Sequence, residues 1–457
     1  MRIAQVAPLA VRIPPRRYGG TERVVHALTE ELVRRGHDVT LFAAGTSISS
    51  ARLHSGSPLP LWDMGVADAL AYRVLQVEDV VRHSAGFDVI HSHVDYLPWL
   101  AGERLQAPLV TTLHGPLDRP ELTPIFEAYR DQPLVSISDS QRKPVAGLGL
   151  RWMGTVYHGL EPSTRSRLGA GDGGYLAFLG RINPEKDPVT AIRVAIRAGI
   201  PIKIAARVDP VDEVYYRECV VPLLDHPLVE WIGEVDDDAK AALLGEARAL
   251  LVPIAWEEPF GLVVIEALGA GTPVITRPRG SMPELLRHGE HGFLVESEDG
   301  LVAACRAVGT IDRVACRAWA LQRFSRQRMA DDYEHVYSAA TTRRPTQPVA
   351  QPAVPRRTAV STFRESYATV GVAMAIPLAV AGVEPPHPLP PADRPPVRGG
   401  GKIASISEVS SSHQQGLRMG LETPETKRVV IAEPEPLHIP RPQPAQEPKP
   451  EPVKVPA

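Results

Sequence analysis

The chain of 457 residues has few cysteines, little net charge and no long apolar run at its start. Its three cysteines, Cys219, Cys305 and Cys316, are odd in number and lack the spacing of metal ligands. They suit small core positions in a reducing cytosol. A net charge of −3 gives the protein no general attraction to nucleic acid or to an anionic membrane. We therefore expect no nucleic-acid partner.

No targeting segment is evident at the N-terminus. Residues 1–8 run directly into what reads as a buried first strand, and no apolar stretch there is long enough for a signal peptide. We expect the catalytic part to be cytoplasmic, with a peripheral position at the inner membrane face as the alternative. The composition, 44% hydrophobic and 23% charged, is ordinary for a soluble globular protein.

The chain does contain a regular alternation of short apolar runs with helical patterns. The runs are bounded by polar residues, Gly or Pro, as parallel strands buried on both faces are. They fall at residues 2–6, 39–43, 87–91, 109–113 and 134–137, and again at 175–179, 201–205, 229–232, 250–254, 274–275 and 293–295. This alternation predicts an α/β fold with two doubly wound, Rossmann-like parallel sheets.

The two series of runs are separated by residues 161–174, where Ser, Thr, Arg, Gly and Asp crowd together and apolar periodicity is lost. We predict one domain over residues 1–160 and a second over residues 161–325, both of ordinary size. Ligands of such folds bind at the carboxyl ends of the strands, so the default site lies between the two domains.

Proline dominates the chain from about residue 343 onward. Because apolar periodicity is also lost, we predict a disordered tail over residues 343–457 that is a candidate for binding a protein partner. Residues 367–383 are apolar, but they are fewer than the roughly 20 of a spanning helix and are interrupted by Pro377. A sticky or partly helical segment is favoured there over a membrane span.

The most informative motif runs from Glu258 to Glu266. If a helix begins near Phe260 and Gly261, its first N–H groups are free to donate to hydroxyls or phosphate oxygens. Glu258 then precedes the helix, whereas Glu266 lies roughly 7–8 Å further along its axis and can accept from the hydroxyls of a ribose. For the two acids alone, a helix with two solvated carboxylates is an equal alternative.

The rest of the chain shifts this balance. The run 258–266 resembles the E-x7-E signature of retaining GT-B glycosyltransferases, in particular family 4, the glycosyl transferases group 1. Residues 180–186 resemble the Gly-Arg…Lys diphosphate clamp of that family, 110–115 its central His strand, 18–22 its N-terminal glycine loop, and 283–285 with 291–295 its C-terminal signature. The resemblance implies a GT-B fold in which a helix over residues 326–342 crosses back to the first domain.

The family resemblance also implies a reaction. The protein would transfer a hexose from a nucleoside-diphosphate sugar, of the UDP-glucose or GDP-mannose type, to an acceptor that the sequence does not identify: a saccharide, a lipid-linked glycan or a small molecule. The implied mechanism is a same-face displacement in which the leaving phosphate draws the acceptor proton. A double displacement through a protein carboxylate stays open.

Two cations are candidates for the diphosphate. Arg181 and Lys186 follow a predicted strand, where they could neutralise the charge that develops on the leaving group. Such a clamp can replace a divalent metal, and no Asp-x-Asp motif is placed to recruit one. We therefore predict neither a metal nor a cofactor. The alternative is a solvated basic loop whose cations pair with Glu185 and Asp187.

The resemblance assigns the remaining site residues. His114 closes a buried strand and would contact the transferred sugar, although a lone histidine there is more often structural. Glu258 would lie near the sugar with the amides around Phe260, Gly261 and Leu262. Gly20, together with Gly19, would bring backbone close to phosphate or acceptor; a plain turn is the alternative.

Several other features carry weaker expectations. His91 and His93 have a spacing that suits a metal, but no third ligand is evident. Residues 138–140 end a strand and are expected to face the cleft. The loops 48–67 and 117–129 have no signature that names an acceptor. Where relatives often carry Asn-Gly, this chain has His158-Gly159.

Three alternatives to a transferase remain. A sugar-nucleotide-binding scaffold would bind donor without turnover and recruit partners through the tail. A related GT-B epimerase would release altered sugar without an acceptor, and a phosphorylase would need phosphate as co-substrate. The joint presence of Arg181, Lys186, Glu258, Glu266 and His114 favours the transferase.

Overall fold

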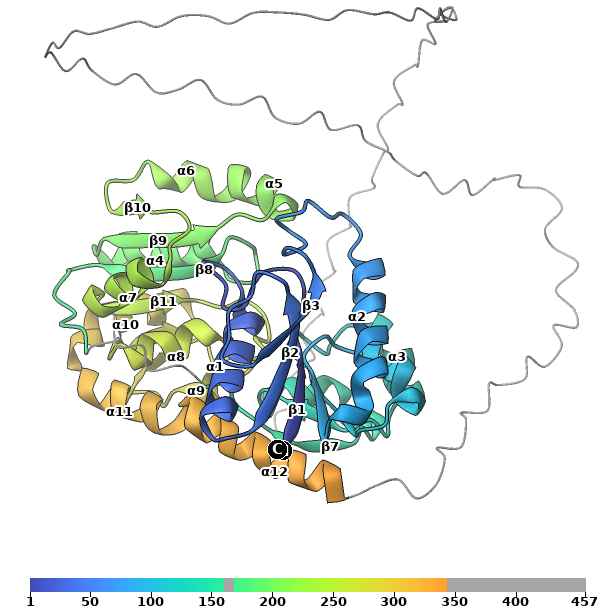
Figure 1. The fold of residues 1–457 in the computed structure, drawn as a ribbon. Helices are drawn as coiled ribbons and strands as arrows, with labels where there is room; N and C mark the ends of the chain where they lie inside the picture. Colours follow the sequence, from blue (N-terminus) through green and yellow to red (C-terminus); the bar gives the residue numbers. More distant parts are fainter. Residues whose placement is uncertain (160–167, 343–457) are drawn as a thin grey trace, which may run out of the picture. The chain divides into compact units, whose positions relative to one another are not determined.

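The structure is a computed structural model that describes residues 1–159 and 168–342. The predicted domain boundary at residue 160, the proline-rich tail and the apolar stretch 367–383 lie outside the described residues. Within the described ranges the chain is α/β, with two parallel sheets as expected. Figure 1 shows the first sheet in blue to teal and the second in green to yellow.

The first sheet has seven strands in the order β3-β2-β1-β4-β5-β6-β7, all paired in parallel. Its strands are β1 Arg2–Val6, β2 Asp38–Ala44, β3 Arg52–Ser57, β4 Val89–Ser92, β5 Leu109–Thr112, β6 Leu134–Ser136 and β7 Trp152–Thr155. The helices of this half are α1 Gly20–Arg34, α2 Leu70–His83 and α3 Thr123–Ala128, with 3₁₀ turns at η1 Ser84–Gly86, η2 Leu97–Arg104, η3 Pro120–Leu122 and η4 Ser140–Leu148.

The second sheet has six strands in the order β10-β9-β8-β11-β12-β13. They are β8 Leu176–Arg181, β9 Ile202–Arg207, β10 Val229–Trp231, β11 Ala249–Val252, β12 Val274–Thr276 and β13 Gly292–Leu294. Its helices are α4 Pro188–Ala198, α5 Glu213–Tyr215, α6 Val221–Leu224, α7 Asp237–Glu246, α8 Leu262–Gly269, α9 Met282–Leu285, α10 Glu298–Ala307 and α11 Arg313–Arg323, with turns η5 Pro210–Asp212, η6 Tyr216–Val220 and η7 Val308–Thr310.

Two strands were missed by the sequence analysis, and both lie at a sheet edge. β3 forms inside the stretch 48–67 that was expected to be a loop, and β7 closes the opposite edge. An edge strand is covered on fewer sides than a central one and need not be a continuous apolar run. Accordingly, β3 reads Arg-Leu-His-Ser-Gly-Ser, with one large apolar residue. Likewise, α3 forms inside the expected loop 117–129.

In both sheets the order in which strands are added reverses beside the first strand of the sheet. β1 pairs with β2 on one side and β4 on the other, and β8 pairs with β9 and β11. Loops on the two sides of such a switch point diverge, so they leave a crevice at the carboxyl ends of the strands. In this chain the two switch points contribute loops to the same cavity, described below.

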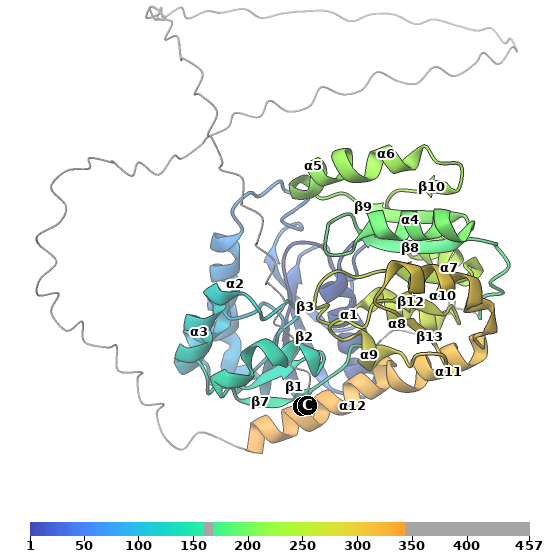
Figure 2. The same cartoon turned by 180° about the vertical axis from the view of Figure 1, so that it is seen from behind.

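Helix α12, Arg326–Thr342, follows α11 and packs against α1 and strands of the first sheet. Figures 1 and 2 show it in orange below β1. Met329, Tyr333 and Tyr337 are buried on its inner face. On its outer face, Arg35 of α1 donates to the Asp331 carboxylate at 2.6 Å. The helix is therefore bound to the first half by both apolar and charged contacts.

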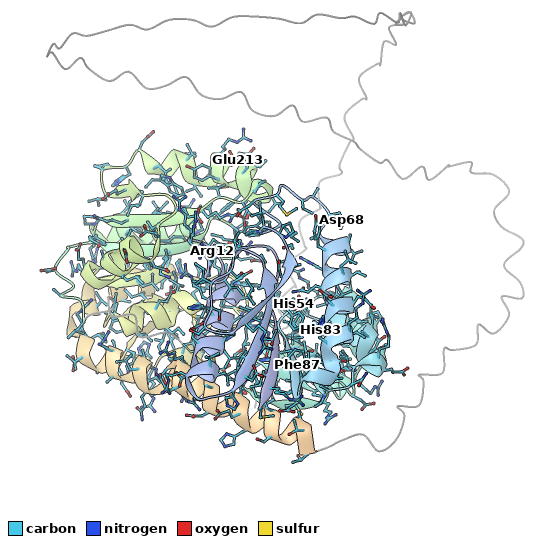
Figure 3. All side chains as sticks on the ribbon, viewed as in Figure 1. Arg12, His54, Asp68, His83, Phe87 and Glu213 are labelled. Carbon is cyan, nitrogen blue, oxygen red and sulfur yellow. The ribbon has the colours of Figure 1, made fainter. Side chains whose placement is uncertain are left out.

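Side chains fill the space between sheets and helices (Figure 3), and the cysteines divide between core and surface. Cys305 and Cys316 are buried as expected, but Cys219 is exposed, which corrects the prediction that all three occupy core positions. It lies in η6, between the short surface helices α5 and α6. Among the described residues, we find no helix with both the length and the apolar character needed to cross a membrane.

Candidate active site

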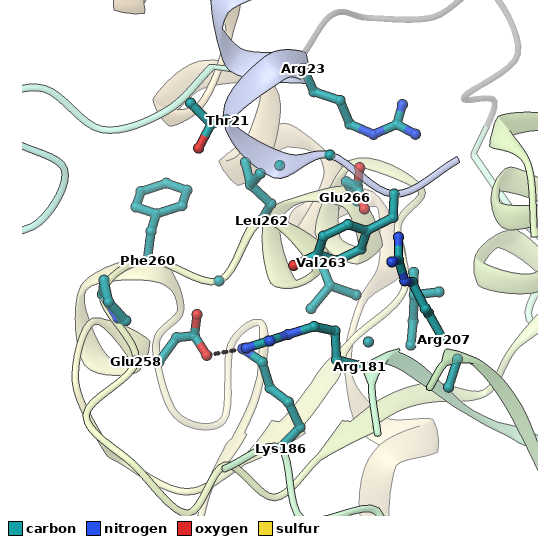
Figure 4. A pocket seen from close by; sticks show the side chains of 18 of the residues that line it. Thr21, Arg23, Arg181, Lys186, Arg207, Glu258, Phe260, Leu262, Val263 and Glu266 are labelled. Carbon is teal, nitrogen blue, oxygen red and sulfur yellow. Dashed lines mark hydrogen bonds and ion pairs between the residues drawn. The ribbon is translucent and has the colours of Figure 1, made fainter. Parts of the chain in front are cut away.

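A cavity of about 370 Å³ lies between the carboxyl ends of the two sheets. It is lined by the loop before α1, the ends of β5, β8 and β9, and the start of α8 (Figure 4). All of the predicted catalytic and donor-binding residues line it: Gly20, His114, Arg181, Lys186, Glu258, Phe260, Gly261, Leu262 and Glu266. These residues come from both halves of the chain, so the site forms only when the two sheets face each other.

The start of α8 forms one wall of the cavity. Gly261 is its N-cap and has φ 92°, a left-handed conformation that favours glycine, and no side chain caps the helix. The Val264 amide donates to the Gly261 carbonyl at 3.0 Å, whereas the first two amides of α8, those of Leu262 and Val263, are available to donate to a ligand. Ser281 holds the preceding loop, because its N–H donates to the Glu258 carbonyl at 2.9 Å and its hydroxyl donates to the Phe260 carbonyl.

Glu258 lies at the centre of a small charged group. The Lys186 ammonium forms an ion pair with its Oε2, and the Trp256 indole N–H donates to the same oxygen at 2.9 Å. The Lys186 nitrogen also lies 5.3 Å from the centre of the Trp256 ring, within range of a cation–π contact. Trp256 was missed by the sequence analysis, because an aromatic residue in a loop has no pattern that marks it.

The other two charged site residues are also paired. Arg181 lies 3.4 Å from Asp209 and 3.7 Å from Glu185, so part of the expected alternative, pairing with Glu185, does occur. Glu266 accepts from Lys240 of α7 at 2.6 Å. Lys240 was missed because no motif in the sequence of α7 marks it. This wall is therefore a set of ion pairs.

His114 belongs to a buried chain of hydrogen bonds. Its Nε2 lies 2.9 Å from Nδ1 of His93, whose Nε2 lies 2.8 Å from Oε1 of Gln5. The Gln5 amide then donates to the hydroxyl of Tyr337 at 3.0 Å. An amide oxygen can only accept, so His93 donates through Nε2 and accepts through Nδ1. His114 must therefore donate through Nε2, which leaves its Nδ1 as a bare acceptor.

The same chain accounts for His91. Its Nδ1 lies 2.8 Å from the Tyr337 hydroxyl and its Nε2 lies 2.8 Å from the Thr112 hydroxyl, which in turn lies 2.9 Å from the hydroxyl of Tyr333. Both ring nitrogens of His91 are used in this way, as are both of His93. The structural interpretation of this pair is therefore preferred over a metal site.

Burial keeps the histidines of this wall neutral. It lowers the pKa of His114 to about 3, and it lowers the pKa of His93 and His158 well below the usual value. His158 stacks on His114 with ring centres 5.2 Å apart and contacts Phe260 at 4.6 Å. The His-Gly pair that replaces Asn-Gly thus places an imidazole in the cavity wall.

Gly20 lies close to the second half of the chain. A Cβ added there would be 3.2 Å from Cδ1 of Leu262, and one added to Gly19, which has φ 147°, would be 2.8 Å from Pro15. The start of α1 therefore faces the start of α8 across the cavity. Glu22, in the first turn of α1, is buried, and burial raises its pKa to about 6.

Residues 138–140 do not line this cavity, which corrects the expectation that they face the cleft. The Ser138 hydroxyl donates to the Pro259 carbonyl at 2.7 Å, and the amides of Asp139 and Ser140 donate to Glu284 at 2.9 and 2.7 Å. These polar strand-end groups thus connect the first half to the loops of the second. They hold the two walls together beside the cavity.

Comparisons with known proteins agree with this architecture. The phosphatidyl-myo-inositol mannosyltransferase of Mycobacterium leprae is 26% identical over 379 residues, which is 75% of this chain and 98% of the relative. Among solved structures, sucrose-phosphate synthase from Thermosynechococcus elongatus superposes with a TM-score of 0.63 at 18% identity, covering 75% of this chain and 99% of its own. HepE of Anabaena in complex with UDP and glucose has a TM-score of 0.59 at 18% identity, covering 74% and 100%.

These likenesses define the class, a two-domain glycosyltransferase of the GT-B fold. Residues 18–160 match the family model described as Glycosyltransferase Family 4, and residues 163–308 match the model described as Glycosyl transferases group 1. The chain therefore belongs to family 4 of the glycosyltransferases, and it is a transferase enzyme.

Proposed function

We propose that this glycosyltransferase transfers a hexose, with retention of the anomeric configuration, from a nucleoside-diphosphate sugar to an acceptor still to be identified. The observation that carries the proposal is the convergence of Arg181, Lys186, Glu258 and the start of α8 on one cavity. A donor of the UDP-glucose or GDP-mannose type is consistent with the names of two similar proteins, the mannosyltransferase of M. leprae and HepE with UDP and glucose.

The charges of the cavity suit a diphosphate. Arg181 can bind phosphate oxygens as a planar fork, and Lys186 can act as a compact point charge beside it. Lys186 is now paired with Glu258, so an incoming diphosphate would share or replace that carboxylate. Glu266, paired with Lys240, is placed to accept from ribose hydroxyls at the other end of the donor.

The neutral histidine wall suits the sugar. With Nε2 donating to His93, the Nδ1 atom of His114 can accept a hydrogen bond from a sugar hydroxyl. A neutral ring does not repel the positive charge that builds at the anomeric centre, whereas a protonated ring would. Its low pKa therefore supports the role in contacting the transferred sugar.

In the proposed step, the bond between the anomeric carbon and the leaving phosphate oxygen breaks, and a bond to the acceptor oxygen forms on the same face. The acceptor proton moves to that phosphate oxygen. Arg181 and Lys186 stabilise the charge on the diphosphate, so the protein contributes position and electrostatics rather than a nucleophile. Double displacement through Glu258 is the competing path.

Metal independence is part of the proposal. Two cations already supply positive charge where the diphosphate would bind, and each carboxylate of the E-x7-E motif is paired with a lysine. Around this cavity the described residues offer no group of three metal-ligating side chains. A cytoplasmic location is also proposed, and the three free cysteines are consistent with a reducing compartment.

The test is donor turnover by the full-length protein in EDTA. UDP, GDP and ADP sugars are supplied with and without candidate acceptors, and NMR records the anomeric configuration of the transferred or released sugar as soon as it forms. Retention with nucleotide release supports the proposal, and inversion overturns it. Turnover that requires added divalent ion overturns metal independence alone.

A scaffold is the competing function. It would show donor binding by calorimetry but no nucleotide release with any acceptor. An epimerase would release altered sugar without an acceptor, and a phosphorylase would act only with added phosphate. The same reaction panel therefore separates all four possibilities.

A further inference from the structure

A second group of chemically active side chains lies outside the cavity, where α2 packs against the edge strand β3. His54 of β3 and Asp79 and His83 of α2 each offer one ligand atom, and these three atoms all lie within 4.8 Å of one another. Asp79 and His83 are four residues apart, so they share one face of the helix. Figure 3 labels His54 and His83 near Phe87, beside α2.

The hydrogen bonds of these side chains show which ring nitrogens carry a proton. Nε2 of His54 lies 2.8 Å from Oδ2 of Asp79, and Nδ1 of His83 lies 2.8 Å from the Asp79 carbonyl oxygen. Since a carbonyl only accepts, Nδ1 of His83 carries the proton. Its Nε2 therefore carries a free lone pair, the form in which imidazole binds metal ions.

The surroundings favour a bound ion over a chance surface cluster. The rings of His54 and His83 lie 4.8 Å apart at 61°, and the buried Phe42 ring lies 4.6 Å from His54. Phe42 gives the group an apolar floor that keeps water from one side. His54 and Asp79 are about one-third exposed, so an ion can enter from the other side.

We propose that His54, Asp79 and His83 bind one divalent ion of the zinc class. Two imidazole nitrogens and one carboxylate oxygen suit Zn²⁺, Ni²⁺ or Co²⁺ and do not suit Mg²⁺, which prefers oxygen ligands. Water completes a tetrahedral site. The site is separate from the transferase cavity and takes no part in its reaction.

Binding requires a small rearrangement. A tetrahedral ion about 2.0–2.1 Å from each ligand holds the ligand atoms roughly 3.3 Å apart, which is closer than the present limit. The exposed His83 ring can close this gap by rotation. Asp79 exchanges its hydrogen bond with His54 for the ion, and the proton on Nε2 of His54 moves to its Nδ1, which frees Nε2 for the ion. The ion then joins α2 to β3, two elements that now share the His54–Asp79 pair.

The test is titration of the EDTA-stripped, full-length protein with Zn²⁺ by calorimetry and with Co²⁺ by visible absorption. We expect one ion to bind per chain at His54, Asp79 and His83. The Co²⁺ form should show the strong visible absorption bands of a tetrahedral site. Asp79→Asn, close in shape, and His83→Ala, at an exposed position, should each weaken that binding about tenfold or more, because loss of a supporting partner alone costs this much. His335→Ala removes an exposed histidine from α12 and is the matched control.

Two results would overturn the proposal. One is that Zn²⁺ does not bind, or that it binds Asp79→Asn or His83→Ala as tightly as it binds the control His335→Ala. The other is binding of Mg²⁺ as tight as that of Zn²⁺, which would indicate an oxygen site. Circular dichroism of each variant shows that it is folded, and if His54→Ala does not fold, His83→Ala still decides the question.

Discussion

The two walls of the cavity are held in position by different forces. The wall from the second half is a set of ion pairs, Lys186 with Glu258 and Lys240 with Glu266. Both partners of each pair belong to the second half. The wall from the first half carries Arg17 and Arg23, but the part around His114 is a neutral chain of hydrogen bonds that runs to α12 through His93 and Gln5. We call this part the neutral wall and the set of ion pairs the charged wall. A charged ligand can replace one partner of an ion pair in the charged wall. The neutral wall offers a fixed arrangement of hydrogen-bonding groups.

This difference separates two tasks. Ion pairs exposed to a cavity are weakened by solvent and reorganise when a stronger partner arrives, which suits a diphosphate that must be bound and released. A buried neutral network is costly to break, since each lost partner leaves an unpaired polar group. It therefore suits the positioning of a single acceptor atom, Nδ1 of His114.

The largest effect should follow from breaking the charged wall. We expect Glu258→Ala and Lys186→Ala each to lower turnover about a hundredfold or more, on the order of 3 kcal/mol, because each removes stabilisation of the transition state. Steady-state kinetics measures this. Glu246→Ala, at an exposed position of α7, should leave the rate unchanged. Near-normal rates in either cavity variant would contradict the site.

A second effect should come from acid, and it falls on the neutral wall. Because burial lowers the pKa of His114 from 6.5 to about 3, the unfolded chain binds this proton first. Stability is therefore complete above pH 6.5 and is lost as the pH falls below it, by about 2 kcal/mol from His114 at pH 5.

Urea unfolding at pH 8 and pH 5 tests this acid effect. His114→Asn should flatten the pH dependence by about that amount, whereas His335→Ala, on the exposed face of α12, should not. An equal dependence in His114→Asn and the unmodified protein would show that His114 is not held neutral.

The same comparison explains what the sequence could and could not predict. Most of the charged wall was predicted, because its residues lie close in sequence to glycine and proline residues that mark strand ends and a helix start: Arg181, Lys186, Glu258, Gly261 and Glu266. Lys240 and Trp256 were not predicted. The neutral wall depends on a contact between Gln5 and Tyr337, 332 residues apart. No local pattern marks such a pair.

The strands divide according to their own residues. The central strands and the edge strands β10 and β13 were predicted, because each falls on an apolar run. The edge strands β3 and β7 were missed, because small and polar residues interrupt their apolar residues. His158 was noticed only as a departure from the family pattern, and its position against His114 became evident from packing.

A third test concerns Glu22, a buried acid in the first turn of α1. Burial raises the pKa of Glu22 from 4.5 to about 6. Stability linked to this group is therefore fully present below pH 4.5 and is lost as the pH rises through 6, at a cost of about 2 kcal/mol. This sign is opposite to that for His114.

Glu22→Gln should therefore stabilise the protein by up to about 2 kcal/mol at pH 8 and by little near pH 4.5. Urea unfolding at several pH values measures the difference between the two proteins, in which the titration of other groups cancels. Glu258→Gln, whose carboxylate is paired with Lys186, is the comparison from the charged wall and should not stabilise at pH 8. Destabilisation by Glu22→Gln at pH 8 would contradict the effect.

The smallest effect should distinguish the hydrogen bonds of Tyr337 from those of Tyr333, the two tyrosines on the inner face of α12. Tyr337→Phe removes the hydroxyl shared by Gln5 and His91 and should cost roughly 1–2 kcal/mol of stability. Tyr333→Phe removes only the contact with Thr112, so it should cost less and leave the path to His114 intact.

The activities of Tyr337→Phe and Tyr333→Phe show whether the hydrogen-bond chain orients His114 or only stabilises the fold. With Gln5 released, the tautomer of His114 is no longer fixed, so Tyr337→Phe should lower kcat by several-fold with little change in donor Kd, because the charged wall still binds the diphosphate. Tyr333→Phe should keep kcat near its normal value. Equal kcat in the two variants would mean that the chain stabilises α12 without orienting His114, and the neutral wall would then be a structural device only.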